Sequence, residues 1–377
     1  MALTGMLELP GAVADADQGG RVAWHFGDPV AEQRALERGR AVVDQGHLAV
    51  IRVAGEDRLT WLNSLTSQSL LGLAPGVGTE TLLLSPQGKL EAALGVVDDG
   101  ASTWLIVEPA QARYVGEWLT KMRFAMRVSV VDDSQNFAVL GFNGDVPAAA
   151  AGYLIWEDPW PHVAPGGTRY GPGEDIHPGV ARRWKLVAVP AAAARDVVAD
   201  LAEQGFTPAG TWAAEAMRIA AWRPGYGSEV DARTIAHEVD WLRTAVHLHK
   251  GCYRGQETIA RVHNLGRPPR RLVFLHLDGS ADVLPEHGSG VLAAGRVVGT
   301  VTSSVRHHEL GPIALALIKR SVAADAPLDV VSQSAPDVVV SAAQEPIVDP
   351  SGQSVDRPAG HGPLMKGLPR VGMIQGT

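Results

Sequence analysis

The last third of the chain places the strongest constraint on its fold. After Pro268 and Pro269 the sequence consists of short apolar runs separated by glycines, as in "RLVFLHL", "GSGVLAAGRVVGTVTSSV" and "GPIALALI". Runs of this length between turn residues are typical of antiparallel strands. We therefore predict a small antiparallel β-domain or barrel after these two prolines, which mark its entrance.

The residues ahead of the barrel combine helices with strands. Apolar spacing predicts an amphipathic helix over 30–43, a strand over 46–55 and a second helix over about 57–71. Three apolar runs between 80 and 109 are separated by "PQG" and "DDG", and these turn sequences predict an antiparallel meander. Pro109 then begins a further helix, since a proline in the first turn loses no hydrogen bond. The fold class that follows is α+β.

A second α+β stretch extends from about 137 to 222. Strands are expected in "FAVLGF" and "WKLVAVP", followed by a helix that ends at Gly205. The segment between the two strands is rich in proline and glycine, which predicts a long surface loop. Trp156 and Trp160 in this loop either pack locally or contribute to binding.

Charge and composition exclude several classes of protein. The 377 residues carry a net charge of -8, which argues against general affinity for nucleic acid or an anionic membrane. No segment reaches the ~18 uninterrupted apolar residues of a membrane span, and the N-terminus lacks the layout of a signal peptide. One cysteine cannot form an intrachain disulfide. We expect a cytoplasmic protein that contacts neither membrane nor nucleic acid directly.

That cysteine lies in a basic segment. Between Arg243 and Arg271 there are seven Lys or Arg residues and one acid, Glu257, inside an acidic chain. Such a concentration of positive charge suits a ligand with carboxylates or phosphates, and a solvated basic helix face is the alternative.

The glycines in this segment favour a ligand-facing turn. Gly251 and Gly255 allow close approach of the backbone to a ligand, and "QETIARV" continues as a helix whose N-terminal amides favour anions. Cys252 would lie beside Lys250 and this helix end, which favours a reactive thiolate. The alternative is that Cys252 is a small buried hydrophobic residue.

The segments "KGCYRGQE", "ARVHNLG" and "GRVVGTVTSS" resemble the signature of the YgfZ-type folate-binding family, which is related to the aminomethyltransferase, or T protein, of the glycine cleavage system. "GEDRLTWLNSLTSQSL", "LLLSPQGKLEAAL" and "MRIAAWRPGYGSEV" occur in the family's order. The resemblance implies a ring of three domains around a central site for tetrahydrofolate or a derivative. It also implies a role in maintaining iron–sulfur enzymes, including one that thiolates tRNA.

The resemblance also predicts where each domain begins and ends. Two of the three domains are placed in a folate-binding core over 1–267, one at about 45–135 and the other at 1–44 plus 136–267. The barrel at 268–348 is the third. Residues 349–377 are polar and glycine-rich without a regular period, and we expect a mobile tail there.

Site residues follow from the motif. Cys252 becomes the candidate catalytic residue. The cofactor-binding candidates in the loop are Lys250, Gly251, Tyr253, Arg254, Gly255, Gln256 and Glu257. His249 departs from the acidic residue that many relatives have before the lysine, so a mechanism that needs a carboxylate there is in doubt.

Acidic residues of the aminomethyltransferases are missing. Their "G-G-x-x-D-D" segment corresponds to "GKLEAA" here, so the acidic pair becomes Ala92 and Ala93, and their folate-facing glutamate falls on Ala220. Glu91 is adjacent, but a shift of one residue on a strand points a side chain to the opposite face. Without these carboxylates nothing obvious orients the folate amine, so aminomethyl transfer is disfavoured.

Further cofactor-binding candidates lie outside the loop. Trp212 or Trp222 would offer aromatic surface to the pterin and benzoyl rings, and Arg218 and Arg223 would reach the ligand. The simpler alternatives are core packing for the tryptophans and ion pairs from Arg218 to Glu215 or Glu229.

The histidine pairs in "HLH" and "RHHE" invite comparison with metal sites. They have neither a cysteine cluster nor histidines at i,i+4 beside a carboxylate, so no metal site is predicted. One thiol likewise cannot supply the four ligands of an ordinary iron–sulfur cluster. A partner, a second subunit or a small thiol would have to supply the remaining ligands of such a cluster.

Two functions from different classes remain open. The first is a folate-binding accessory protein that supports iron–sulfur enzymes or cluster carriers, in assembly or repair, and thereby tRNA modification. The second is a folate-dependent one-carbon transferase or demethylase that uses the same pocket. A third possibility is a vestigial pocket on a protein whose surface binds a partner.

Overall fold

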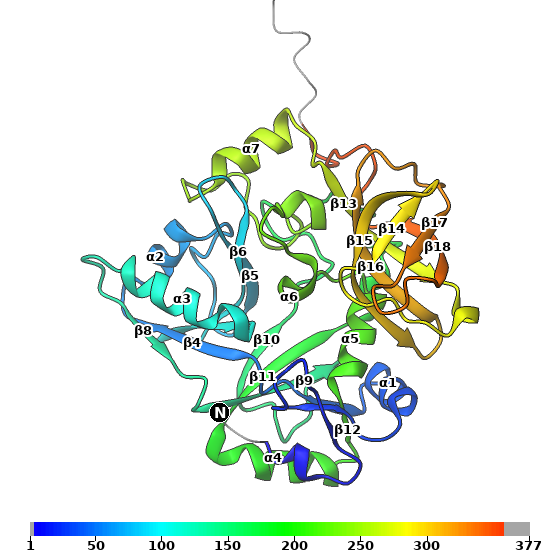
Figure 1. The fold of residues 1–377 in the computed structure, drawn as a ribbon. Coiled ribbons are helices and arrows are strands. Elements are labelled where there is room, and N and C mark those ends of the chain that lie inside the picture. Colours follow the sequence, from blue (N-terminus) through cyan, green and yellow to red (C-terminus); the bar gives the residue numbers. More distant parts are fainter. Residues whose placement is uncertain (1–3, 358–377) are drawn as a thin grey trace, which may run out of the picture.

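The computed structural model describes residues 4–357, which form three lobes arranged as a ring (Figure 1). The first, called here the inserted lobe, is a five-stranded antiparallel sheet in the order β5-β6-β7-β4-β8. Its strands are β4 (Ala49–Ala54), β5 (Gly78–Leu84), β6 (Leu90–Asp98), β7 (Ser102–Val107) and β8 (Ser129–Asp132). Helices α2 (Arg58–Leu65) and α3 (Pro109–Lys121) cover one face through a buried apolar cluster. The predicted meander and the helix that begins at Pro109 are confirmed.

The second lobe, called here the host lobe, is a five-stranded sheet in the order β10-β11-β9-β3-β12, in which only the β3–β12 pair is parallel. Its strands are β3 (Ala41–Asp44), β9 (Phe137–Asn143), β10 (Leu154–Glu157), β11 (Trp184–Pro190) and β12 (Thr207–Ala209). Helices α1 (Pro29–Glu37) and α5 (Thr211–Ala220) pack on one face, and α4 (Ala194–Glu203) packs on the other. The alternation of side chains along each strand explains how both faces are buried.

The third lobe is the predicted barrel, which is closed and has six strands in the order β13-β16-β15-β14-β17-β18. Its strands are β13 (Arg270–Leu277), β14 (Gly290–Ala293), β15 (Arg296–His307), β16 (Gly311–Lys319), β17 (Leu328–Val331) and β18 (Val339–Pro346). On β13, Val273 and Leu275 fill the barrel, whereas Leu272 and Phe274 pack against the rest of the ring. Both faces of this strand are buried, so its sequence is continuously apolar instead of alternating. The predicted α+β class with a C-terminal antiparallel barrel is confirmed.

Shorter elements connect the lobes. They are η1 (Met6–Glu8), β1 (Val13–Ala14), β2 (Ala23–His25), η2 (Pro178–Ala181), η3 (Ala191–Ala193), α6 (Tyr226–Glu229), η4 (Ala236–Val239), α7 (Gln256–Asn264) and η5 (Gly279–Ala281). Within the described part of the chain, no helix combines the length and apolarity needed to cross a membrane.

The helix predicted over 30–43 is wrong in its second half, because α1 ends at Glu37. Gly39 adopts a left-handed backbone with φ of 67°, and the Arg40 amide donates to the Ala35 carbonyl at 2.8 Å. Such a glycine ends a helix, and the apolar residues after it form strand β3 instead. The helix predicted over 57–71 is likewise shorter, because α2 ends at Leu65.

The proline-rich segment between β10 and β11 is less exposed than predicted. Trp160 is almost fully buried, and its indole nitrogen donates to the Ala221 carbonyl at 2.9 Å. Trp156 lies on β10 and is also buried. Local packing, one of the two alternatives for these tryptophans, is therefore what the structure shows for Trp160, whereas Trp156 also lines the central cavity.

Strand β3 lies beside β9 and β12, so residues before the inserted lobe share a sheet with residues after it. The domain limits given above remain a prediction. Within the expected tail, the Asp349 amide donates to the Tyr170 carbonyl at 2.8 Å and the Val355 amide to the Arg169 carbonyl at 3.2 Å. These bonds attach residues 349–357 to the host lobe, and the rest of that expected tail lies outside the described residues.

Candidate ligand-binding cavity

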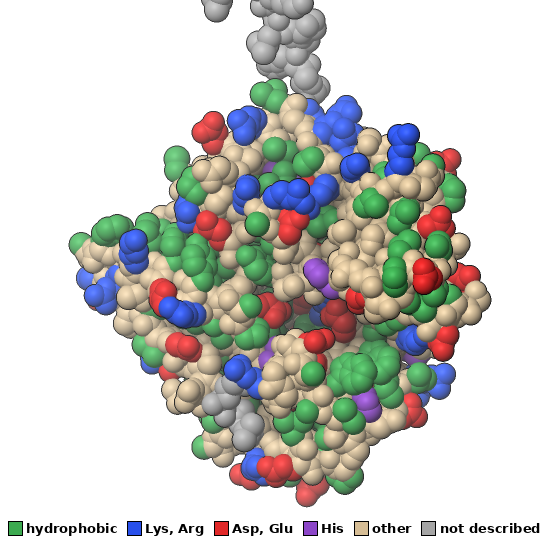
Figure 2. Space-filling view, viewed as in Figure 1, with side chains coloured by type: hydrophobic (Ala, Val, Ile, Leu, Met, Phe, Trp, Pro, Cys, Tyr) green, Lys and Arg blue, Asp and Glu red, His purple; other side chains and the backbone are tan. Residues whose placement is uncertain are grey.

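A cavity of about 870 Å³ lies at the centre of the ring, where the three lobes meet. Figure 2 shows its mouth as a hollow with acidic side chains around it. Strands β6 and β7, helices α5 and α6 and barrel strand β15 supply parts of its wall. Seven acidic side chains and four arginines line it, so the cavity is acidic overall. Its volume is typical of sites for cofactors and other small molecules.

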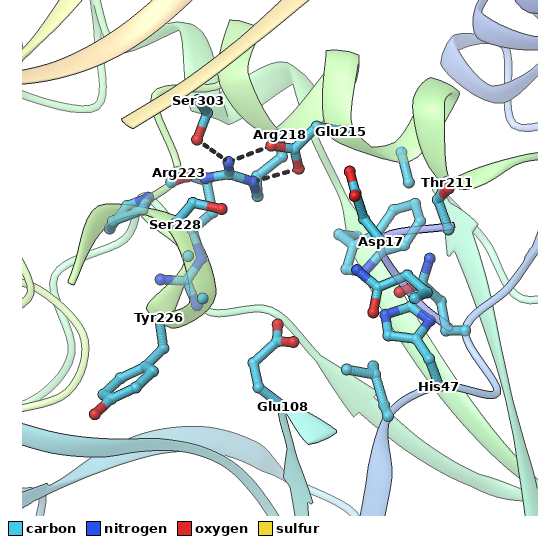
Figure 3. A pocket seen from close by; sticks show the side chains of 18 of the residues that line it. Asp17, His47, Glu108, Thr211, Glu215, Arg218, Arg223, Tyr226, Ser228 and Ser303 are labelled. Carbon is cyan, nitrogen blue, oxygen red and sulfur yellow. Dashed lines mark hydrogen bonds and ion pairs between the residues drawn. The ribbon is translucent and has the colours of Figure 1, made fainter. Parts of the chain in front are cut away.

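Arg218 on α5 holds the cavity wall together (Figure 3). Its guanidinium donates to Glu215 at 2.7 Å, to Glu229 at 2.7 Å and to the hydroxyl of Ser303 at 2.7 Å. It also donates to the Arg223 carbonyl at 2.6 Å. These acceptors engage all five donors of the guanidinium. Both ion pairs considered from the sequence are present, and Arg218 lines the cavity without a free donor for a ligand.

Arg223 forms the second ionic junction of the wall. It donates to Glu80 at 2.6 Å and to Asp158 at 3.1 Å, and Arg182 donates to Asp158 at 2.6 Å. Burial raises the pKa of Glu80, although Arg223 opposes this shift. Glu80 belongs to the inserted lobe and Asp158 follows β10 of the host lobe, so this network joins two lobes.

Glu108 is a carboxylate of the wall that is available to a ligand. It follows β7, directly before the first residue of α3, and points into the cavity (Figure 3). Among the described residues, none donates a hydrogen bond to its side chain. Burial raises its pKa, Arg218 counteracts the shift and Glu215 adds to it. Sequence reasoning missed Glu108, and the one available signal was an acidic residue between a buried strand and a helix.

Strand β6 shows where the expected carboxylates are absent. Ala92 is fully buried against the helices of the inserted lobe, whereas Ala93 faces the cavity. Glu91 lies on the same side of the strand as Ala93, but it is ion-paired with Arg254 at 2.8 Å. Ala220 is partly buried against the central apolar cluster. The wall at Ala93 therefore has a methyl group where a carboxylate would face a ligand.

The two candidate tryptophans have different environments. Trp212 lines the cavity and stacks on Trp24, with ring centroids 4.7 Å apart and an angle of 14° between the planes. Trp222 is buried, next to Phe274 and His177. Trp212 can offer an aromatic face to a ligand, and Trp222 belongs to the core.

The N-terminal part of the chain contributes a face of the cavity that sequence reasoning also missed. Asp17, Trp24 and His47 line it. His47 is buried, its Nδ1 has no hydrogen-bond partner, and burial lowers its pKa to about 4. These residues are far apart in the sequence and form no motif, so no local signal could have indicated them.

The cysteine loop does not line the cavity. Lys250 donates to the carbonyls of Asn63, Thr66 and Gln68 at 2.6, 2.7 and 2.7 Å, in the last turn of α2 and the residues that follow it. Its three ammonium protons are thereby engaged, and burial lowers its pKa to about 8. Cys252 is exposed, so the alternative that it is a small buried hydrophobic residue is wrong.

Other residues of the loop make contacts within the protein. Gln256 donates to the Lys250 carbonyl at 3.3 Å, Arg254 pairs with Glu91, and Tyr253 is buried beneath Lys250. Gly251 and Glu257 are exposed. The structure brings the loop candidates together with one another but not to the cavity, which is lined instead by the candidates Trp156, Trp212, Arg218 and Arg223.

Gly255 is required by close packing of backbone on backbone. It adopts a φ of 84° at the start of α7, and a Cβ atom there would lie 2.6 Å from the Ser85 carbonyl oxygen. The variant Gly255→Ala is expected to lower the free energy of unfolding by at least about 1–2 kcal/mol, from backbone strain alone. Urea denaturation measures this loss.

Gly251→Ala is the matched control, since nothing lies within 4 Å of a Cβ built at Gly251. Equal stability of the two alanine variants would contradict the packing role of Gly255.

The comparisons with known proteins agree on one relationship. Residues 6–151 match the model of the GCVT N-terminal domain, and residues 270–349 match that of the glycine cleavage T-protein C-terminal barrel domain. The chain is 27% identical over 320 residues to an aminomethyltransferase of a Synechococcus strain, a match that covers 79% of this chain and 85% of the relative. It is 28% identical over 313 residues to an aminomethyltransferase of Deinococcus deserti, covering 78% and 81%.

Two further similarities are relevant. A putative chloroplastic transferase of Arabidopsis thaliana is 29% identical over 288 residues, covering 71% of this chain and 62% of that protein. The crystal structure of aminomethyltransferase T from Bartonella henselae superposes with a TM-score of 0.71 at 16% identity, covering 93% of this chain and 96% of the other. This last similarity shows that the two proteins share a fold.

Proposed function

Because the chain belongs to the glycine cleavage T-protein superfamily, we propose that it binds tetrahydrofolate or a derivative in the central cavity. We further propose that it acts as a cytoplasmic accessory protein of the YgfZ type, supporting iron–sulfur enzymes in cluster assembly or repair and thereby tRNA modification. This role involves no direct contact with nucleic acid.

The observation that carries the proposal is the composition of the cavity wall. The cavity is large enough for a cofactor, yet Ala93 faces it where the transferase pattern has a carboxylate. A carboxylate at that place would orient a reacting amine and stabilise its charged form. Retention of the cavity together with this loss favours binding without aminomethyl transfer.

The lining also supports a particular orientation of the folate. A pterin ring carries an amino group and ring N–H donors, which suit an acidic cavity and the free carboxylate of Glu108. Trp212 can stack on an aromatic ring of the ligand. The negatively charged glutamyl end is expected to extend past the acidic mouth into solvent, because the arginines in the wall are already ion-paired.

Calorimetric titration with tetrahydrofolate under reducing conditions tests the cofactor assignment. Trp212→Ala is expected to weaken binding roughly tenfold or more, because aromatic stacking on a heterocycle contributes about 1–3 kcal/mol. Cys252→Ala is the control and should bind like the wild type, since Cys252 lies outside the cavity. A folded wild-type protein that gives no binding at high micromolar ligand would refute the assignment.

The exposure of Cys252 supports the accessory role. The thiol faces solvent, where a partner protein can reach it and a folate in the cavity cannot. One thiol cannot hold an ordinary cluster, so the partner must supply the remaining ligands. Recovery of an oxidatively damaged iron–sulfur enzyme should be promoted by the wild type and lost with Cys252→Ala. Equal recovery with both proteins would remove the cysteine from the mechanism.

Glu108 favours the second function, a one-carbon transferase or demethylase. Its free carboxylate, with a raised pKa, has the properties of a general acid or base in a cavity. Incubation with tetrahydrofolate and an aminomethyl donor separates the two functions, because the carbon of such a donor is already at the formaldehyde level and its transfer releases only ammonia. Formation of methylene-tetrahydrofolate by the wild type, and its loss in Glu108→Gln, would establish the transferase function, whereas no product from either protein supports the accessory one.

A further inference from the structure

A buried amide fixes helix α1 to the barrel. Gln33 is almost fully buried, its Nε2 donates to the Arg306 carbonyl at 3.0 Å, and its Oε1 accepts from the His308 amide at 2.8 Å. The side chain thus pairs with the end of β15 much as a neighbouring strand would. Residues of α1 one turn further on must face the β15–β16 turn.

Glu37 is the residue one turn beyond Gln33, on the same face of α1. Its Oε2 lies 3.2 Å from Nε2 of His308, and Glu309 adds a second carboxylate. Ligand atoms of the three residues all lie within 4.8 Å of one another. An imidazole and two carboxylates from two lobes therefore converge at one point.

The imidazole of His308 is the informative member of this group. Its side chain is 1% exposed, and neither ring nitrogen makes a hydrogen bond to a described residue. A buried polar group without a partner costs roughly 1–3 kcal/mol. The Nε2 of His308 is close to the Glu37 carboxylate but not aligned with it for a hydrogen bond, so proximity to Glu37 does not satisfy the ring.

The distance between His308 Nε2 and Glu37 Oε2 fits two ligands of one metal ion. Zinc binds histidine nitrogen and carboxylate oxygen at about 2.0–2.1 Å in tetrahedral geometry, which places neighbouring ligand atoms roughly 3.3 Å apart. The observed distance of 3.2 Å is close to this value. Glu37 is half-exposed and Glu309 is exposed, so both can rotate toward an ion, and solvent can supply a fourth ligand.

We propose that Glu37, His308 and Glu309 form a binding site for a divalent cation of the zinc type, which clamps α1 of the host lobe to the barrel. The imidazole selects zinc-like ions over magnesium or calcium, which prefer oxygen ligands. None of the three residues lines the central cavity, so this inference is independent of the proposed function. The motif "HHE" by itself did not indicate a metal site, because Glu37, the third ligand, lies far from it in the sequence.

Titration of the full, untagged chain with zinc chloride tests the site, in a Cys252→Ser background so that the exposed thiol cannot bind the metal. We expect one zinc per chain, a raised melting temperature and no comparable effect of magnesium chloride. His308→Ala and Glu37→Gln should each weaken binding by more than about tenfold, since even residues that only support a ligand contribute that much. His276→Ala is the matched control, because His276 pairs with Glu345 at 2.6 Å on the same barrel.

Two results would overturn the inference. One is a folded background protein that binds no zinc, which would leave the contact between His308 and Glu37 as an ion pair. The other is zinc binding that survives unchanged in both His308→Ala and Glu37→Gln.

Discussion

The variant Arg223→Met is expected to unfold with a free energy about 3–5 kcal/mol lower than that of the wild type. Glu80 and Asp158 are both buried and both accept hydrogen bonds from Arg223. Removal of the arginine leaves Glu80 without its cationic partner and Asp158 with Arg182 alone. Because the two carboxylates come from different lobes, the loss should also loosen the ring around the cavity. Urea denaturation followed by tryptophan fluorescence measures the change.

Two further variants show whether charge burial is the cause. In Arg113→Met the arginine removed pairs with Glu117 on the exposed surface of α3, so stability should be unchanged. Adding Glu80→Gln and Asp158→Asn to Arg223→Met should restore part of the lost stability, since burying a neutral amide costs less free energy than burying an unpaired carboxylate. If the triple variant is less stable than Arg223→Met, packing rather than unpaired charge is the dominant effect.

Four buried histidines are expected to lower stability as the pH decreases from about 6.5 toward 4. Burial lowers the pKa of His47 and His307 to about 4, and that of His177 and His237 to about 3. Over this range the unfolded chain binds protons on these four side chains and the folded protein does not. Each therefore contributes a slope of about 1.4 kcal/mol per pH unit, and stability rises with pH. Asp44 acts in the opposite direction, because burial raises its pKa to about 6.

His237→Gln isolates one of these contributions. The free energy of unfolding of this variant should depend on pH with a slope smaller by one proton, about 1.4 kcal/mol per pH unit, between pH 4 and 6. Urea denaturation at several pH values gives both slopes. His276→Gln is a suitable control, because His276 is on the surface of the barrel. Identical slopes for wild type and His237→Gln would show that His237 is protonated in the folded protein.

The barrel and the meander could be predicted because their strands are neighbours in the chain and are separated by turn residues. Helix α1 shows the limit of such reasoning. Apolar residues resume at Ala41 after the stretch Glu37–Arg40, and the left-handed backbone at Gly39 separates helix from strand. The apolar pattern alone does not show whether the residues after such a short polar stretch continue the helix or begin a strand.

The cysteine loop shows a different limit. The sequence indicates that the backbone at Gly255 lies close to another group. In the structure that group is the Ser85 carbonyl and not a ligand. The cations of this segment are similarly engaged inside the protein. Arg243 pairs with Asp240, Arg270 with Asp231 and Glu238, and Lys250 with three carbonyls. A net charge counted along a segment cannot reveal partners that come from elsewhere in the chain.

The cavity could be predicted as a consequence of the resemblance but not residue by residue. Glu215 could be identified as a partner of Arg218 because they are three positions apart on one helix. Glu229 was also considered as a partner, but Ser303 comes from the barrel and no partner marks Glu108 among the described residues. Each of these residues is ordinary in its local context, and only the closure of three lobes brings them together.

The position of β3 between β9 and β12 has a consequence for synthesis of the chain. Its sheet partners are made only after the whole inserted lobe has been translated, so β3 must wait without them. The inserted lobe, by contrast, contains all five of its strands in one continuous stretch. Because domains tend to fold as units while the chain emerges, the lobe that starts second is the first that can be completed on the ribosome, and the lobe that starts first closes around it.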